Sequence, residues 1–421
     1  AGEGAAPWGG KKGLSSASPM VFGFQGPRIV MGRGCAATAI AAALKQLKIT
    51  RPLIVTGSGG LSRHQDLFRE VFPSDGGFEN TGDGGFENTG GGFPYSAFAV
   101  SVSGEPTVED AVRISKFAIE RGCDGVLAVG GGSALDVGKA ASALIPNSHR
   151  DVYDFLEVVG KGMGLDYDPL GLIAVPTTSG TGSEATKNAV LKSVAHGLKV
   201  SIRHDKMFPA VAVLDPLLTV SCPPSVTAHV GMDTLCQVME PYLSIAPNPF
   251  TDALALEGIK RAARSLRDAV GDGGDIEARE DLSVASVMGG MALANSKLGV
   301  VHGFAAVLGG RYEGAPHGAL CAALLPLVFE KNAQVLEGIL SSSPTTALLA
   351  DAKTMDALVK LGRFQEVSRL LTGNPLATIE DGVAWLHALS ADLNIPPLSA
   401  LCPGTYCVCV SNHSLYAVYA V

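Results

Sequence analysis

Short apolar runs alternate with amphipathic stretches over the first half of the chain. The runs are typical of strands buried on both faces of a parallel sheet, and they lie at 28–31, 52–56, 98–102, 125–129, 172–176 and 211–216. Helical periodicity appears at 36–47 and at 107–121, where Thr107 is the predicted N-cap. This alternation predicts an N-terminal α/β domain with a parallel sheet.

The strand pattern stops at Pro223 and Pro224, and only helical periodicity follows. The helical stretches cover 225–243, 251–270, 277–296 and 319–340. We therefore predict an α/β domain at 20–220 and an all-α C-terminal domain at 221–398. A flexible segment at 1–19 precedes them, and a tail of different character follows at 399–421.

A tandem repeat interrupts the first domain. Residues 75–82 are repeated identically at 83–90, and both copies are rich in glycine without an apolar period. The composition predicts an inserted surface loop at 74–93, since loops tolerate insertions readily. A ligand-binding role for the repeat is the less favoured alternative.

Composition and charge narrow the classes of function. The 421-residue chain has a formal net charge of −8 and no basic stripe, which argues against a nucleic-acid partner. It has no apolar run of the ~18 residues that a membrane span needs. Its eight cysteines are scattered, as reduced thiols of a soluble intracellular protein are. Segment 1–19 is either a targeting remnant or a plain flexible terminus, so cytoplasmic and organellar locations both stay open.

Glycine-rich turns follow three of the predicted strands. Run 52–56 leads into Gly57, run 125–129 into a triple glycine with Ser133, and run 172–176 into the small-residue loop 177–184. Backbone N–H groups at such turns can bind phosphates, and the carboxyl ends of parallel strands share one edge. The sequence therefore predicts one dinucleotide site at this edge.

A carboxylate and two imidazoles are the candidates for a metal site. Asp233 and Gln237 are four residues apart and share one face of a predicted helix, whereas His302 and His317 follow on later segments. An acid and two imidazoles brought together can hold a divalent transition metal. The alternative is that each is a hydrogen-bonded polar group of the core.

Four longer motifs carry a resemblance to a known family. They are Gly130-Gly131-Gly132-Ser133 with Asp136 and Lys139; the run from Pro176 to Glu184; Gly231-Met232-Asp233 through Ala253; and Leu298 to Gly303 through Pro316-His317-Gly318. From about residue 20 to about 398 the chain resembles the group III, iron-containing alcohol dehydrogenases, which include maleylacetate reductases. The resemblance implies a dehydroquinate synthase-like architecture, with NAD(P) and a divalent metal, Fe²⁺ or Zn²⁺, in the cleft between two domains.

The resemblance also implies roles for individual residues. Those expected to hold or line the path of the cofactor are Gly57, Gly130, Gly131, Gly132, Ser133, Asp136, Thr177, Thr178, Ser183 and Lys199. Asp233, His302 and His317 match catalytic metal ligands, with Gln237 as the fourth. Gln237 stands where most members have histidine, and an amide oxygen is a weaker ligand. Ala306 stands where many members have a second, proton-transferring histidine. We interpret these departures as a subgroup of the family rather than as decay of the site.

We therefore predict an NAD(P)-dependent oxidoreductase that moves a hydride between nicotinamide and a small alcohol, aldehyde or keto compound with the help of a metal. Gly57 and Ser58 supply no acid to hold the ribose hydroxyls, which favours NADP. We expect a homodimer or a subunit of a larger assembly. The alternatives are a maleylacetate-type, metal-independent reductase using Arg203, His204 and Arg311, a dehydroquinate synthase-type lyase, and a catalytically silent nucleotide-binding assembly subunit.

Overall fold

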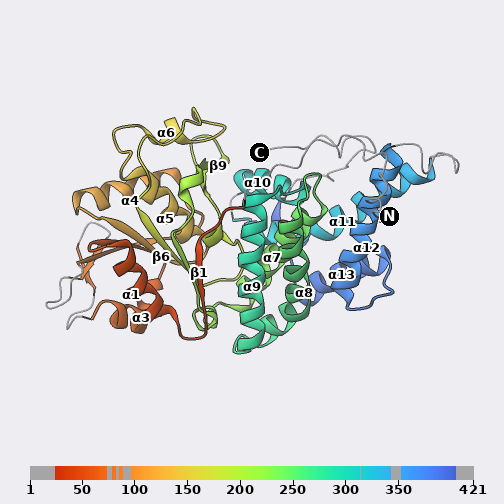
Figure 1. Cartoon of the computed structure of the whole chain (residues 1–421), viewed down its shortest axis with the longest axis horizontal. Helices are drawn as coiled ribbons and strands as arrows, with labels where there is room; N and C mark the ends of the chain where they lie inside the picture. Colours follow the sequence, from red (N-terminus) through yellow and green to blue (C-terminus); the bar gives the residue numbers. More distant parts are fainter. Residues whose placement is uncertain are drawn as a thin grey trace, which may run out of the picture.

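The computed structural model describes residues 24–73, 78–81, 85–88, 96–312, 314–342 and 352–403. The predicted segment 1–19 and residues 404–421 of the predicted tail lie outside these ranges. Within them an α/β half and a helical half lie side by side along the longest axis of the molecule (Figure 1). The predicted fold class, an α/β domain with a parallel sheet followed by an all-α domain, is confirmed.

The described part of the N-terminal half is built on an eight-stranded sheet of order β1-β10-β7-β6-β2-β5-β4-β3. All six predicted runs form strands that pair in parallel: β1 (Arg28–Met31), β2 (Pro52–Gly57), β5 (Ala97–Val102), β6 (Gly125–Gly130), β7 (Gly171–Pro176) and β10 (Val211–Leu214). Parallel pairing brings their carboxyl ends to one edge, where the glycine-rich turns lie.

Helices cover both faces of this sheet, because alternate residues of each strand point to opposite sides. In β2, Ile54 packs into the cluster formed with α1 and α3, whereas Val55 packs into the cluster formed with α4 and α5. The helices of this half are α1 (Ala36–Leu47), α2 (Gly60–Arg63), α3 (Gln65–Val71), α4 (Val108–Glu120), α5 (Gly132–Leu144) and α6 (Val152–Phe155). The predicted cap is present: Thr107 Oγ1 accepts the N–H of Asp110 at 3.0 Å.

The repeat region differs from the predicted loop. Its described residues include two short strands, β3 (Glu79–Asn80) and β4 (Gly85–Asn88), which pair antiparallel, and β4 extends the sheet antiparallel to β5. The Phe78 ring packs edge-on against Phe68 and Phe72, at centroid distances of 6.0 and 6.3 Å. The packing of the Phe78 ring and the free edge of β5 stabilise strands here in spite of the many glycines. The predicted insert loop is therefore wrong for these described residues, which form strands.

A two-stranded hairpin, β8 (Asn188–Ser193) and β9 (Leu198–Arg203), was not predicted. Ala189, Leu191, Val200 and Ile202 point inward from it and pack against α4 and α5 in the core. In β9 the alternation of Val200 and Ile202 with polar residues was the available signal, whereas β8 has the apolar Val190 between Ala189 and Leu191. In Figure 1, β9 lies beside α10, so the hairpin reaches the helical half.

The helical half contains four predicted helices and several that the periodicity did not reveal. The helices are α7 (Pro224–Leu243), α8 (Pro249–Gly271), α9 (Ile276–Asn295), α10 (Val300–Arg311), α11 (His317–Ser341), α12 (Ala352–Thr372), α13 (Ile379–Asp392) and α14 (Leu398–Leu401). Helix α11 is long and apolar enough to cross a membrane, but 56% of its apolar window is buried within the protein. It packs against α7, α10, α12 and α13, as the central helix of a globular domain does.

Loop 177–184, which follows β7, forms the junction between the two halves. Thr234 Oγ1 of α7 donates a hydrogen bond to the Ser179 carbonyl at 3.1 Å, and Ser179 Oγ is 3.0 Å from Ser283 Oγ of α9. Gly182 has a φ of +58°, and a Cβ there would lie 2.5 Å from a backbone carbonyl oxygen of α9. The loop therefore packs so closely that only glycine fits at this position.

Candidate metal and nucleotide site

Three helices of the C-terminal half bring the predicted acid and imidazoles together. Asp233 lies in the middle of α7, His302 in the first turn of α10, and His317 at the first residue of α11. His302 Nε2 is 3.3 Å and His317 Nε2 is 4.0 Å from Asp233 Oδ1. The side chains of Asp233 and His302 are only 3% and 10% exposed, whereas that of His317 is 29% exposed, so the cluster is buried except at His317.

Asp233 Oδ1 and His302 Nε2 face each other in this cluster. Among the described residues, both atoms are buried without a hydrogen bond. Leaving such atoms unsatisfied is costly, and a divalent cation between them would satisfy both. Burial raises the pKa of Asp233, but His317 and His302 outweigh it and hold that pKa at about 2, so the carboxylate is ionised. The donor set therefore fits a metal ion.

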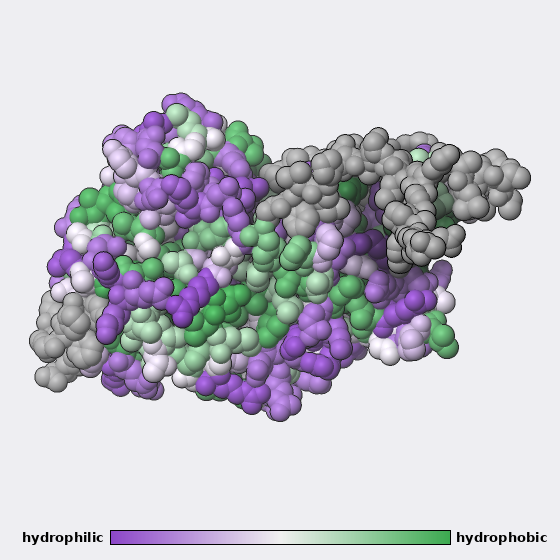
Figure 2. Space-filling view, viewed as in Figure 1, coloured by the Kyte–Doolittle hydropathy of each residue, from purple (hydrophilic) through white to green (hydrophobic). Residues whose placement is uncertain are grey.

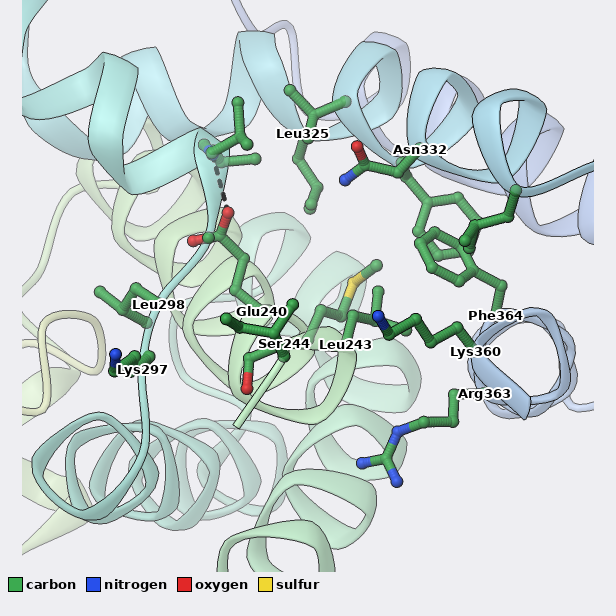
Figure 3. A pocket seen from close by; sticks show the side chains of 18 of the residues that line it. Glu240, Leu243, Ser244, Lys297, Leu298, Leu325, Asn332, Lys360, Arg363 and Phe364 are labelled. Atoms are coloured by element: carbon green, nitrogen blue, oxygen red, sulfur yellow. Dashed lines mark hydrogen bonds between the residues drawn. The ribbon is translucent and has the colours of Figure 1, made fainter. Parts of the chain in front are cut away.

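Glu240, two helical turns after Asp233, fixes the orientation of His302. Its Oε2 is 2.7 Å from His302 Nδ1, and its Oε1 accepts the backbone N–H of Val301 at 2.7 Å. Figure 3 shows this carboxylate at the edge of a pocket whose lining is mostly apolar, with the bond to the start of α10 drawn as a dashed line. With Nδ1 held by Glu240, Nε2 faces Asp233, as in metal sites where a carboxylate orients the histidine.

Burial lowers the pKa of His302, but Cys321, Asp233 and Glu240 together hold it well above the usual value. The site thus favours positive charge on this ring. A divalent cation supplies that charge and displaces the proton from Nε2, which is why metal binding at such sites releases protons.

Gln237 lies one turn after Asp233 and is buried, but its amide is engaged elsewhere. Its Nε2 donates a hydrogen bond of 2.8 Å to the carbonyl of Thr181. A carbonyl can only accept, so this bond fixes which end of the amide faces loop 177–184. In the structure Gln237 fastens α7 to that loop, and its role as a metal ligand stays a prediction.

Two cysteines at the site were missed by the sequence reasoning. Cys321, one turn after His317 on α11, is fully buried with Sγ 3.7 Å from His317 Nε2. Cys236, three residues after Asp233, has Sγ 3.7 Å from the Nδ1 of His302, on the side of that ring held by Glu240. Both cysteines lie one helical turn from a candidate ligand, Cys236 after Asp233 and Cys321 after His317, and this spacing could have identified them. The sequence analysis instead interpreted all eight cysteines as ordinary buried thiols.

The predicted nucleotide residues gather at the carboxyl edge of the sheet. Gly57 at the end of β2 lies next to Gly130 at the end of β6, and Gly130 is in register with Pro176 of β7. Thr177 N–H donates to the Gly130 carbonyl at 2.9 Å. Helix α5 begins directly after Gly131, and no side chain caps it. Its first backbone N–H groups are therefore not bound by a side-chain acceptor and could bind an anion.

The triple-glycine turn and loop 177–184 touch each other. A Cβ at Gly131 would lie 3.3 Å from Thr178 Oγ1, and one at Gly132 would lie 2.7 Å from the Thr181 side chain. Ser133, half-buried, occupies the first turn of α5 beside them. The structure therefore brings the two predicted cofactor loops into one continuous surface.

Asp136 and Ser183 bind each other. Ser183 Oγ donates to Asp136 Oδ1 at 2.6 Å, and Lys139 Nζ, which is fully buried, is 2.9 Å from the same oxygen. Lys139 also donates to Thr186 Oγ1 at 2.7 Å. Burial raises the pKa of the neighbouring Glu184 to about 7, against the opposing charge of Lys139. These residues anchor α5 to the loop, so the geometry gives Asp136 and Ser183 a positioning role.

Lys199 on β9 bridges the two halves. Its buried Nζ is 2.8 Å from Glu105 Oε2, and a Cβ at Gly309 of α10 would lie 3.2 Å from the same nitrogen. Burial lowers the pKa of His317, but Cys321 and Asp233 hold it above its usual value, and the charge of Lys199 opposes them. Arg203 is one of the basic residues named for the maleylacetate-type alternative. Its Nε is 3.5 Å from Glu157 Oε1, so this arginine forms an ion pair within the protein.

The fold and the site define a class of two-domain proteins in which a parallel sheet with a glycine-rich edge meets a helical domain carrying an acid–imidazole cluster. The chain belongs to the iron-containing alcohol dehydrogenase family. Residues 90–216 match the family described as iron-containing alcohol dehydrogenase, and residues 227–399 match the C-terminal domain of the Fe-containing alcohol dehydrogenase family. The resemblance stated from the motifs is confirmed.

Individual relatives support the same assignment. The chain is 40% identical over 232 residues to the probable alcohol dehydrogenase EutG of Escherichia coli, and this alignment spans 55% of the chain but only 57% of EutG. It is 38% identical over 294 residues to alcohol dehydrogenase 4 of Saccharomyces cerevisiae, 69% of each. The sulfoacetaldehyde reductase of Bifidobacterium kashiwanohense, solved with NAD⁺, superposes with a TM-score of 0.71 at 26% identity, over 90% of this chain and 87% of that one.

Proposed function

We propose that this protein is an NAD(P)-dependent oxidoreductase that transfers a hydride between nicotinamide and a small alcohol or aldehyde with the help of a divalent metal. The observation that carries the proposal is the pair of buried, unpartnered atoms, Asp233 Oδ1 and His302 Nε2, beside His317. Membership of the iron-containing alcohol dehydrogenases and a relative solved with NAD⁺ support it.

Each group of residues has a distinct task. Asp233, His302 and His317 hold the metal, which when bound polarises the substrate oxygen and lowers the pKa of an alcohol. Glu240 keeps His302 in the ligand orientation. Backbone N–H groups behind Gly131 bind the pyrophosphate of the nucleotide. Asp136, Lys139 and Ser183 hold the triple-glycine turn in place beside loop 177–184, and so would keep the surface for the nucleotide in one shape.

The direct test is a set of assays on the purified full chain. We expect about one zinc or iron per chain, oxidation of short primary alcohols with NAD⁺ or NADP⁺, and loss of activity on chelation that added metal restores. Metal-free protein that reduces keto acids would favour the maleylacetate-type reductase. Nucleotide binding without turnover of any alcohol, aldehyde or keto acid would favour the silent subunit.

Glu240→Gln should weaken metal binding by about 10- to 100-fold, because an amide has one acceptor oxygen for the two donors, Val301 N–H and His302 Nδ1–H, and carries no charge. The measurement is the zinc dissociation constant against a competing chelator. Glu257→Gln, which changes a Glu paired with Arg261 on the surface of α8, is the control. Equal affinities in the two variants would show that Glu240 does not orient the ligand.

Gly57→Asp should lower NADPH affinity by about tenfold or more, since a carboxylate there repels a 2′-phosphate while it can accept hydrogen bonds from free ribose hydroxyls. A Cβ at Gly57 meets no atom within 4 Å, so the substitution fits the fold. Fluorescence titration with NADPH and NADH measures the change. A wild-type preference for NADH, or equal losses for both nucleotides, would contradict the predicted NADP preference.

The homodimer is still a prediction, and sedimentation of the full chain would measure the oligomeric state. Strand β1 is one edge of the sheet and exposes Ile29 and Met31. Figure 2 shows apolar residues gathered near the junction of the two halves, with hydrophilic residues over much of the outer surface. An apolar edge strand of this kind can pair with a second copy.

A further inference from the structure

A fourth protein ligand is compatible with the proposed function, because a catalytic zinc ion can expand to five ligands and so still accept the substrate oxygen. Asp233, His302 and His317 supply three donor atoms. The sequence candidate for the fourth, Gln237, has its amide nitrogen bound to the Thr181 carbonyl at 2.8 Å. This bond uses the amide nitrogen, so only the amide oxygen of Gln237 could serve as a ligand, and it is a harder donor than a thiolate.

Cys321 offers a sulfur donor close to the other three candidate ligands. Donor atoms of Asp233, His302, His317 and Cys321 all lie within 4.8 Å of one another, and Cys321 Sγ is 3.7 Å from His317 Nε2. In a tetrahedral zinc site with Zn–S of about 2.3 Å and Zn–N of about 2.0 Å, sulfur and nitrogen ligands are about 3.5 Å apart. The observed separation is therefore close to that of two ligands of one ion.

Two features distinguish Cys321 from the other nearby thiol. Cys236 Sγ contacts the Nδ1 of His302, the atom that Glu240 also binds, and its sulfur groups with Glu240 and His302 rather than with Asp233. Cys321 lies instead with the unpartnered atoms, Asp233 Oδ1 and His302 Nε2, and its side chain is fully buried. No other use of this thiol follows from the proposed hydride transfer.

We propose that Cys321 is the fourth metal ligand, giving an Asp/His/His/Cys site in which a thiolate on α11 takes the place that Gln237 leaves open on α7. On binding, the S–H proton is released and the sulfur forms a bond to the cation. A thiolate is a softer donor than an amide oxygen or an imidazole, so the site prefers Zn²⁺ or Co²⁺ to Fe²⁺. This inference rests on the metal-binding part of the proposed function.

Cobalt is the probe that tests it. We expect the metal-free full chain, titrated with Co²⁺ alone, to develop a near-ultraviolet thiolate-to-cobalt charge-transfer band that saturates at about one ion per chain. Cys321→Ser and Cys321→Ala should lose this band and bind Co²⁺ about tenfold or more weakly, whereas Cys236→Ser and Gln237→Ala should keep the band. The wild-type spectrum needs no variant, so the proposal stays testable if one variant fails to fold.

Three outcomes overturn the inference: no cobalt binding, bound cobalt without the thiolate band, or a band that disappears with Cys236→Ser and persists with Cys321→Ser. A competition of Zn²⁺ against Fe²⁺ under anaerobic conditions should favour zinc, and Cys321→Ser should reduce that preference by about tenfold. These measurements use neither nucleotide nor substrate. A protein that shows the band but oxidises no alcohol would contradict the proposed activity alone.

Discussion

Asp233→Ala is expected to abolish metal retention and to lower kcat/KM by about a thousandfold, while nucleotide affinity stays within a factor of about two. The Asp233 carboxylate faces both imidazoles, so its removal takes away the carboxylate oxygen among the proposed metal ligands. Metal polarisation is worth several kcal/mol of transition-state stabilisation, and about 4 kcal/mol corresponds to roughly a thousandfold in rate. Elemental analysis, NADPH titration and initial rates measure the three quantities.

Asp252→Ala is the matched control, because Asp252 belongs to the same helical half but pairs with Arg363 at 2.6 Å, away from the cluster. It should retain the metal. If Asp233→Ala kept its metal content, the ligand set would be wrong. If it lost nucleotide binding as well, the two sites would be coupled more strongly than their separate elements indicate.

Lys139→Met is expected to destabilise the N-terminal half by about 3–5 kcal/mol and to lower its melting temperature by about 10 °C. The change keeps the length of the side chain but removes the cation that faces Asp136 and Glu184 in this buried network. An uncompensated buried charge remains, and α5 loses its hydrogen bonds to Thr186 and Asn188, which follow loop 177–184. Nucleotide affinity should therefore fall together with stability. Thermal unfolding followed by circular dichroism, with NADPH titration, measures both.

Lys161→Ala removes an exposed lysine that pairs with Asp154 and should leave the melting temperature unchanged. Exposed ion pairs contribute little because water screens them. A fall in melting temperature of the same size in both variants would mean that the loss is general to lysine removal. An unchanged Lys139→Met protein would show that the buried network does not hold the loops together.

The sequence predicted most of the sheet, because buried parallel strands appear as uniform apolar runs that need no partner to be identified. It did not predict β3 and β4, since their pairing depends on the free edge of β5 and on the Phe68 and Phe72 rings, which no local pattern contains. Helix α10 was missed for a similar reason. It is short and apolar all round, so it has no amphipathic period.

The candidate site was predicted in part. The motifs identified Asp233, His302 and His317, and the structure places them together. Glu240 and Cys321 were missed, although they lie seven residues after Asp233 and four after His317, on the same helical faces. Spacing alone gives no reason to choose them, because each acquires its role from a residue on another helix. Only the crossing of α7, α10 and α11 brings them to the histidines.

The contact of Gly182 with α9 limits how the protein can move. Bonds from Thr234, Gln237 and Ser283 fix the same loop to α7 and α9, so the two halves cannot slide past each other there. We expect any motion between the two halves to be a rotation with loop 177–184 as its pivot. The parts of each half far from this loop would then move most, while the strip between the triple glycine and Asp233 would stay nearly still.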